Sequence, residues 1–510
     1  MNILGLGGLL NDPACAVLRG GQLAAAVEQK KLARRWRAGD LPQEALKSAL
    51  DLSRLRPEQI DIVALARPLS EIGDSTLHVD LRELFPSARV VVVEHHLAHA
   101  ASAFFASPFD RATVLTLDRA GDFRCGARWR GEANWLTLDH EAYYPDSLGD
   151  LYGRVTELLG FEPQSEEHKV QWLSTSADDE LAPVFADLLP ARPGDWPRPD
   201  RSYFDAARFY SRLGLHPGAA IPENLKPKIA AGLQRAVERA VESMAGEGEN
   251  LCLAGGLFLN VLLVAALERS GKWKNVFVQP AAGNAGTALG AALWAWQRPI
   301  EFSTLSLGPA FQPEEIKQVV ENCKLRFRVL MTTEELISQA TDLLSQNRIV
   351  AWMQGRMEFG PRALGNRSIL ASPLDTYSTE NLNVYIKHRE PFRKFAASVP
   401  EELAASYFDA GANSRFLATV SRVRPEHRKT FEAAILGRDL IRLHTVSEAE
   451  NPLFHRLLLD WGRKTGLPVL YNTSFNLFGD PLVCTPRDAV RSFYSSGIDA
   501  MFAGHFLLEK

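Results

Sequence analysis

The chain has 510 residues, with 57 lysines and arginines against 61 aspartates and glutamates, and 46% of its residues are hydrophobic. This length predicts more than one domain, and the near-neutral charge disfavours a protein that coats nucleic acid. No apolar run reaches the roughly 18 residues of a membrane span. The N-terminus lacks the basic segment of a signal peptide, and the five cysteines are scattered. We therefore expect a cytoplasmic protein without a disulfide framework.

The first part of the chain contains a pattern that occurs twice. A short apolar strand is predicted over residues 2–8, and a hairpin around Gly20-Gly21 follows it. A strand over 113–118 and a hairpin over 123–138 repeat this order. The repetition predicts a duplicated α/β unit, although such strings also arise by coincidence.

Two histidines follow the predicted strand 90–94. His95 and His99 are four residues apart at the start of a predicted helix, so they share one face and can converge on a metal. Asp118, at the end of a neighbouring strand, is a natural third ligand. The alternative is a helix N-terminus at which the histidines only cap or pack.

Two glycine-marked turns come later in the same half. Gly255-Gly256 ends a predicted strand, and the segment 283–286 precedes an alanine-rich helix. Ligands of α/β sheets gather at turns of this kind.

A stretch without helical or strand periodicity divides the chain at residues 301–313. We interpret it as a linker between an N-terminal domain, residues 1–300, and a C-terminal domain, residues 314–510. The second domain is predicted to be α/β, with strands near 348–353 and 469–470.

The C-terminal domain contains clustered cations. Glycines and a proline give the segment 355–368 an irregular backbone, and arginines within it and after it supply donors for phosphate or carboxylate. The clustered cations are Arg356, Arg362, Arg367, Lys387, Arg389, Arg393, Lys394 and Arg442. The pattern favours an anion site over the alternative, a surface of salt bridges. The dinucleotide fingerprint and the G-x-x-x-x-G-K-[ST] phosphate loop are both absent from the sequence.

Four segments together resemble the O-carbamoyltransferases of the nodulation-factor and antibiotic-tailoring family. They are residues 95–103, 253–256, 355–368 and 472–486, and the resemblance covers nearly the whole chain. It implies an α/β protein whose N-terminal domain is a duplicated actin-like (ASKHA, or RNase H-like) domain, similar to tRNA threonylcarbamoyladenosine synthases. The C-terminal domain is similar to the α/β domains that form carbamoyl adenylate.

The resemblance also implies an activity. We expect an ATP-dependent carbamoyltransferase that makes carbamoyl adenylate from carbamoyl phosphate and Mg²⁺-ATP. The carbamoyl group would pass to a hydroxyl of a small molecule, such as a natural product or a sugar. The expected partners are carbamoyl phosphate, ATP, this acceptor and a second copy of the chain, with no membrane and no nucleic acid.

Residue roles follow from the resemblance, position by position. The catalytic residues would be Asp12, Lys387 and Arg442. Carbamoyl phosphate would be held by Lys387, Arg442, Asn472, Thr473 and Ser474. ATP would be held by Arg362, Arg367, Gly255, Gly256 and Asn260. A divalent metal, Fe²⁺ in this family, would be held by His95, His99, Asp118 and Asn284.

The sequence departs from the family pattern mainly in the N-terminal domain. Asn11 stands where the family has histidine, and an amide cannot act as a general base near neutral pH. Asn284 replaces an aspartate ligand, which weakens the predicted metal site, and Trp172 replaces a glycine. Two alternatives therefore stay open, namely transfer to an amine acceptor and a degenerate N-terminal binding scaffold.

Overall fold

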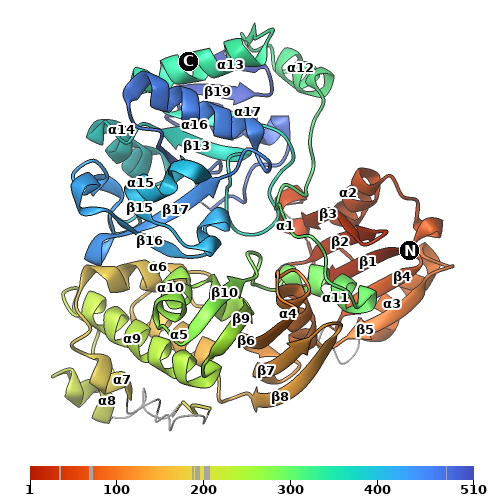
Figure 1. Ribbon diagram of the computed structural model, residues 1–510, viewed down its shortest axis with the longest axis vertical. Helices are drawn as coiled ribbons and strands as arrows, with labels where there is room; N and C mark the ends of the chain where they lie inside the picture. The colour runs from red at the N-terminus through yellow and green to blue at the C-terminus, as the bar shows by residue number, and fades with distance from the viewer. Residues whose placement is uncertain (34–35, 68–72, 187–188, 190–195, 200–206, 478) are drawn as a thin grey trace.

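The computed structural model describes the chain except residues 34–35, 68–72, 187–188, 190–195, 200–206 and 478 (Figure 1). Two five-stranded sheets form the N-terminal half and a ten-stranded sheet forms the C-terminal half. No helix in the described part of the chain is both long enough and apolar enough to cross a membrane.

The two N-terminal sheets share one strand order. The first contains β3 (Gln22–Glu28), β2 (Ala14–Arg19), β1 (Asn2–Gly7), β4 (Ile62–Ala66) and β5 (Arg89–Val93). The second contains β8 (Trp135–Tyr143), β7 (Arg124–Glu132), β6 (Arg111–Gly121), β9 (Gly248–Ala254) and β10 (Trp273–Val278). In each sheet the first strand pairs antiparallel with a hairpin strand and parallel with the fourth strand. The predicted duplication is therefore confirmed, and the topology is that of the actin-like fold.

The equivalent helices of the two units pack against each other between the sheets. Helix α4 (His95–Phe104) follows β5, and α11 (Gly286–Trp296) follows β10. A Cβ added at Gly290 of α11 would lie 1.8 Å from the carbonyl oxygen of Ala98 in α4, so glycine permits this approach. Small residues thus bring the N-terminal ends of two equivalent helices close to the end of β6.

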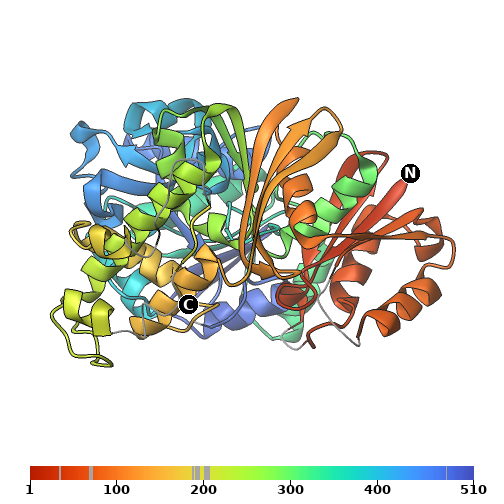
Figure 2. The same cartoon turned by 90° about the horizontal axis from the view of Figure 1, so that it is seen from below.

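Further helices surround the N-terminal sheets. They are α1 (Gln29–Leu32), α2 (Gln43–Ser53), α3 (Gly73–Leu84), α5 (Leu148–Leu158), α6 (Glu167–Leu173), α7 (Ala182–Ala186), α8 (Ala207–Arg212), α9 (Lys226–Ala245) and α10 (Val261–Arg269). Figure 2 shows the first unit, in red and orange, at one end of the molecule.

The C-terminal sheet is mixed, with parallel and antiparallel pairs. In sheet order its strands are β11 (Arg328–Val329), β20 (Phe506–Glu509), β19 (Ala500–Ala503), β12 (Val350–Met353), β13 (Arg367–Ala371), β18 (Leu470–Ser474), β14 (Ala396–Pro400), β17 (Leu440–Val446), β16 (Val420–Val423) and β15 (Phe408–Asp409). Its helices include α12 (Pro313–Asn322), α13 (Thr333–Ser345), α14 (Thr376–Asn381), α15 (Ala404–Tyr407), α16 (Pro452–Thr465) and α17 (Pro486–Tyr494).

The two halves share a hydrophobic core. The cluster around α4 and α11 continues through Leu305 and Leu307 into Phe359, Leu364 and Phe416 of the C-terminal half. A site formed by side chains of both halves is therefore held by continuous packing.

Candidate functional site

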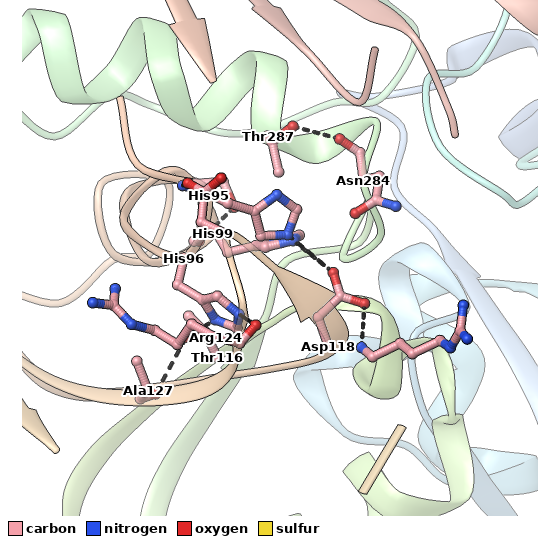
Figure 3. A network of polar contacts seen from close by, with 12 residues as sticks. His95, His96, His99, Thr116, Asp118, Arg124, Ala127, Asn284 and Thr287 are labelled. Carbon is pink, nitrogen blue, oxygen red and sulfur yellow. Dashed lines mark hydrogen bonds and ion pairs between the residues drawn. The ribbon is translucent and has the colours of Figure 1, made fainter. Parts of the chain in front are cut away.

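A buried cluster of two histidines and an aspartate lies where α4 meets the end of β6 (Figure 3). The Nε2 atoms of His95 and His99 lie 3.1 and 3.3 Å from the same oxygen, Oδ2, of Asp118. One ligand atom from each residue lies within 4.8 Å of the others. The structure thus brings together three of the four predicted metal ligands from two elements.

The helix N-terminus determines which histidines face the cluster. Glu94 caps α4, because its carboxylate accepts hydrogen bonds from the backbone N–H groups of His96 and Leu97. His96 points the other way, and its ring nitrogens lie 2.9 Å from Thr116 Oγ1 and 3.0 Å from the carbonyl oxygen of Arg124. Burial lowers the pKa of His96 well below its ordinary value, so this ring is neutral and structural.

The carboxylate of the cluster is ionised. Burial opposes the charge of Asp118, but hydrogen bonds from His95 and His99 outweigh burial and hold the pKa of Asp118 well below its ordinary value. An ionised carboxylate oxygen facing two imidazole nitrogens is a donor set that suits a first-row divalent metal.

Asn284 supplies a further oxygen beside the cluster. It lies just before α11, and its side-chain Oδ1 is buried without a hydrogen-bond partner among the described residues. Asn284 and His95 line the same small cavity, and Figure 3 shows the Asn284 side chain on one side of the cluster. An orphaned buried acceptor is costly unless something binds it. The two imidazoles, the carboxylate and this amide therefore fit the metal that the sequence predicts.

A small cavity of about 60 Å³ opens beside His95. Its lining includes Asn11 and also Asp122, whose Oδ1 atom is buried and without a partner among the described atoms. The sequence prediction did not include Asp122, although its place four residues after Asp118 in a glycine-containing turn was a usable signal. The carboxylate of the predicted catalytic Asp12 instead lies 2.6 Å from Lys30 Nζ, in a half-exposed ion pair.

The second candidate site lies on the C-terminal sheet, where three strands place side chains in one row. Arg442 of β17 is paired with Ala396 of β14, which is paired with Asn472 of β18. Paired residues of neighbouring strands lie on the same face, and the short alanine leaves room between the two longer polar side chains. Asn472 donates to Ser398 Oγ at 3.1 Å, and its buried Oδ1 has no described partner.

Positive charge is concentrated around this row. Desolvation lowers the pKa of Arg442 well below its ordinary value, and the charges of Arg362, Arg389 and Arg393 lower it further. Burial likewise lowers the pKa of Lys387, with contributions from Arg389 and Arg393. In the described part of the chain, no ion pair joins Arg442 to a carboxylate. Arg393 is paired with Glu390 at 3.3 Å, so Arg442 is a desolvated cation of this group that lacks a carboxylate partner among the described residues. A desolvated cation among like charges indicates a site for an anionic ligand.

Lys387 is fastened to the end of β18. Its Nζ donates to the carbonyl oxygen of Ser474 at 2.8 Å and to Oδ1 of Asn476 at 2.6 Å, and Ser474 Oγ lies 3.3 Å away. Lys387 therefore fixes the end of β18 at Ser474 relative to Asn476.

Two arginines of the segment 355–368 donate hydrogen bonds to backbone carbonyl oxygens. Arg367 is fully buried and donates to the carbonyl oxygens of Gln354 at 2.7 Å and Pro309 at 3.3 Å. Arg356 donates to the carbonyl oxygens of Gly308 and of Ala24 in β3. Both guanidinium groups thus donate to backbone carbonyl oxygens, and the ATP contact of Arg367 stays a prediction.

Arg362 lies closer to the other half of the molecule. Its guanidinium donates to the carbonyl oxygen of Leu259 at 3.3 Å, and desolvation lowers its pKa to about 10. Two arginines are predicted to bind ATP. Arg362 is one of the cations that lower the pKa of Arg442, whereas Arg367 is not.

Two of the other predicted ATP residues, Gly255 and Gly256, lie beside the end of β6 that carries Asp118. Gly255 has φ +102, and a Cβ there would lie 2.2 Å from the carbonyl oxygen of Leu117. A Cβ at Gly256 would lie 3.0 Å from Oδ1 of Asp118. Asn260 accepts from the backbone N–H of Leu263 and caps α10. The glycine turn thus allows backbone to approach Asp118 closely, whereas Asn260 stabilises a helix end.

Two family models match this chain in the same order as its two halves. The model described as Carbamoyltransferase N-terminus matches residues 74–293, and the model described as Carbamoyltransferase C-terminus matches residues 341–510. Together they include the histidine cluster and the cationic row.

Curated relatives agree with these models. The chain is 31% identical to an uncharacterized protein of Synechocystis, over 100% of this chain and 97% of the relative. It is 31% identical to nodulation protein NolNO of Sinorhizobium fredii, over 98% of this chain and 79% of the relative. It is 30% identical to a 3'-hydroxymethylcephem-O-carbamoyltransferase of Amycolatopsis lactamdurans, over 65% of this chain and 61% of the relative.

Proposed function

Because the chain belongs to the carbamoyltransferase family, we propose that it makes carbamoyl adenylate from carbamoyl phosphate and ATP and transfers the carbamoyl group to a small-molecule hydroxyl. The observation that supports this most directly is the desolvated Arg442, which lies among like charges and has no paired carboxylate in the described part of the chain. Carbamoyl phosphate and ATP are both anions, so bound substrates would remove the repulsion among these cations.

In the first step, carbamoyl phosphate loses inorganic phosphate to water and leaves carbamate. A carbamate oxygen then attacks the α-phosphorus of Mg²⁺-ATP, and pyrophosphate departs. Arg442, Asn472, Thr473 and Ser474 would hold carbamoyl phosphate, with Lys387 fixing the strand end beside it. Positioning and charge neutralisation are the main requirements of phosphoryl transfer.

The ATP phosphates would lie toward the remaining arginines. Arg362 and Arg389 contribute to the field at Arg442, and desolvation lowers the pKa of Arg389 to about 9. Since Arg362 also donates to Leu259 of the N-terminal half, we place the adenylate where the two halves meet.

In the second step, the acceptor oxygen attacks the carbamoyl carbon and AMP leaves. A divalent metal held by His95, His99, Asp118 and Asn284 would supply Lewis acidity, which lowers the pKa of the acceptor hydroxyl. The hydroxyl proton needs an acceptor, and Asn11 cannot take it. The buried Oδ1 of Asp122, in the cavity beside His95, is placed for this role.

The acceptor would enter from the side of the first sheet. A larger cavity of about 820 Å³ shares the lining residue Leu10 with the small cavity beside His95. Its lining includes Trp36, Asp40 and Glu44. This volume lies within the range of small-molecule sites, about 300–1,000 Å³.

The first test is pyrophosphate exchange into ATP that depends on carbamoyl phosphate. We expect exchange in the wild-type protein and a loss of at least about 100-fold in Arg442→Ala, because an essential charged contact to the substrate is removed. The matched control is Arg463→Ala, which removes an arginine whose side chain is 73% exposed on α16. Absence of exchange in the wild type, or full exchange in Arg442→Ala, would contradict the proposal.

The second test follows labelled carbamoyl groups into a panel of acceptors. Transfer to hydroxyl compounds is the expected result. Transfer to amines alone would favour the amine acceptor, since an amine needs less help from a base than an alcohol. Exchange without any transfer would favour a binding scaffold in the N-terminal half.

A further inference from the structure

Trp172 belongs to the N-terminal half of the chain, but its side chain lies beside the candidate anion site of the C-terminal half. It lies on α6, is 4% exposed, and packs in an apolar cluster with Leu262 of α10 and with Val420 and Leu436 of the C-terminal half. The indole therefore bridges the two halves at the edge of the cationic row.

The indole ring also contacts Arg442. The guanidinium carbon Cζ lies 5.1 Å from the ring centroid, within the distance of a cation–π interaction. Arg362, Arg389 and Arg393 surround Arg442 with like charge, and no carboxylate is paired with it in the described ranges. The face of Trp172 is thus an electron-rich partner for this guanidinium before any anion binds.

Helix α6 holds the ring firmly against both halves. Gln171 Oε1 accepts from the backbone N–H of Val261 at 2.8 Å, within the N-terminal half. Lys169 Nζ lies 2.7 Å from Oε1 of Glu390, across the boundary. A side chain on so fixed an element can restrict the rotamers of its partner, and such preorganisation lowers the cost of binding.

We propose that Trp172 is a positioning residue, which holds the Arg442 guanidinium where it meets carbamoyl phosphate. Because the ring comes from the N-terminal half, the anion site is complete only when the two halves are docked. This inference rests on the proposed function for the identity of the anion. The stacking itself is independent of the reaction.

The test compares Trp172→Leu, which keeps apolar bulk, with Trp172→Phe, which keeps an aromatic face. Removing a cation–π contact of about 0.5–2 kcal/mol corresponds to roughly 2–30-fold in affinity. In the exchange assay we expect Trp172→Leu to raise KM for carbamoyl phosphate by about that factor and to leave KM for ATP unchanged. Trp172→Phe should restore most of the lost affinity.

The control is Trp461→Leu, which removes a tryptophan that is 1% exposed in the C-terminal half and outside the cationic row. This variant should lower Tm, but it should not raise KM for carbamoyl phosphate relative to KM for ATP. Equal effects of leucine and phenylalanine at position 172, or a parallel rise of both KM values, would overturn the proposal.

Calorimetric binding of inorganic phosphate separates this inference from the proposed function. Wild-type protein without exchange activity, but with phosphate binding weakened by Trp172→Leu and restored by Trp172→Phe, would refute the reaction and support the positioning role. Wild-type protein that binds no phosphate would overturn both.

Discussion

Neighbouring residues of one helical turn have separate tasks in the histidine cluster. His95 and His99 share an oxygen of Asp118, whereas His96 has both ring nitrogens occupied by Thr116 and a backbone carbonyl. A histidine whose two nitrogens are already bonded to protein has none left for a metal. Comparing metal binding by variants of His96 and His99 therefore tests the assignment of the metal ligands.

We predict that His99→Ala weakens Fe²⁺ binding by more than about 100-fold, because a ligand is lost. His96→Ala should retain the metal and lower Tm, since it removes a buried ring that is hydrogen-bonded to Thr116 and to the carbonyl oxygen of Arg124. Metal content after anaerobic loading, measured by mass spectrometry, checks both. Equal metal content in the two variants would contradict the assignment.

At the scale of elements, the close packing of α4 and α11 positions the metal-binding side chains. Both helices follow the fifth strand of their unit, so the duplication places their N-terminal ends together. His95 and His99 lie on one of these helices, and Asn284 lies two residues before the other. A change in helix separation would move the histidines relative to the amide.

We predict that Gly290→Ala destabilises the protein by about 1–3 kcal/mol, because its methyl group would overlap the carbonyl oxygen of Ala98. The matched control is Gly153→Ala in α5, where a Cβ would lie 3.6 Å from the nearest side-chain atom. There alanine should be neutral or stabilising by up to about 1 kcal/mol. Urea unfolding of both variants measures the difference, and similar midpoints would refute this account of the helix contact.

Some features of the fold and of the candidate sites could be predicted from the sequence, and others could not. Strand and hairpin signals around Gly20-Gly21 repeat locally, so the duplicated fold could be predicted. The spacing of His95 and His99 likewise follows from helix geometry alone. The structural roles of Arg356 and Arg367 could not be predicted, because their acceptors are backbone carbonyls distant in the chain. Every residue has a backbone carbonyl, so the amino-acid sequence does not mark these acceptors.

At the scale of the whole molecule, a partly buried carboxylate joins the two halves. Glu268 of α10 accepts hydrogen bonds from Asn413 Nδ2 at 2.7 Å and from the hydroxyl of Thr419. Desolvation raises the pKa of Glu268 above its ordinary value despite these contacts. The folded protein therefore holds a proton on Glu268 at pH values where the unfolded chain has released it.

This coupling predicts a pH-dependent cost of folding. With a raised folded-state pKa, the cost is absent below the unfolded pKa, about 4.3, and grows as pH rises through the folded pKa. Glu268→Gln removes the ionisable group and keeps an acceptor for Asn413. We expect the Tm of this variant, minus that of wild type, to increase from pH 4.5 to pH 8.

The control for this prediction is Glu249→Gln, at a carboxylate whose side chain is 69% exposed beside Lys274. Its Tm difference from wild type should stay nearly constant over the same range. A constant difference for Glu268→Gln as well would show that Glu268 has no part in the pH dependence of stability.

The attachment of the segment 355–368 to the first sheet bears on the order in which the chain acquires its structure during translation. Arg356 donates to the carbonyl oxygen of Ala24, and Lys31 donates to the carbonyl oxygens of Glu358 and Gly360. Domains generally fold as they leave the ribosome, N-terminal parts first. The strand that accepts the hydrogen bond of Arg356 is thus synthesised more than 300 residues before Arg356. The first sheet can therefore form before the segment 355–368 leaves the ribosome and packs against it.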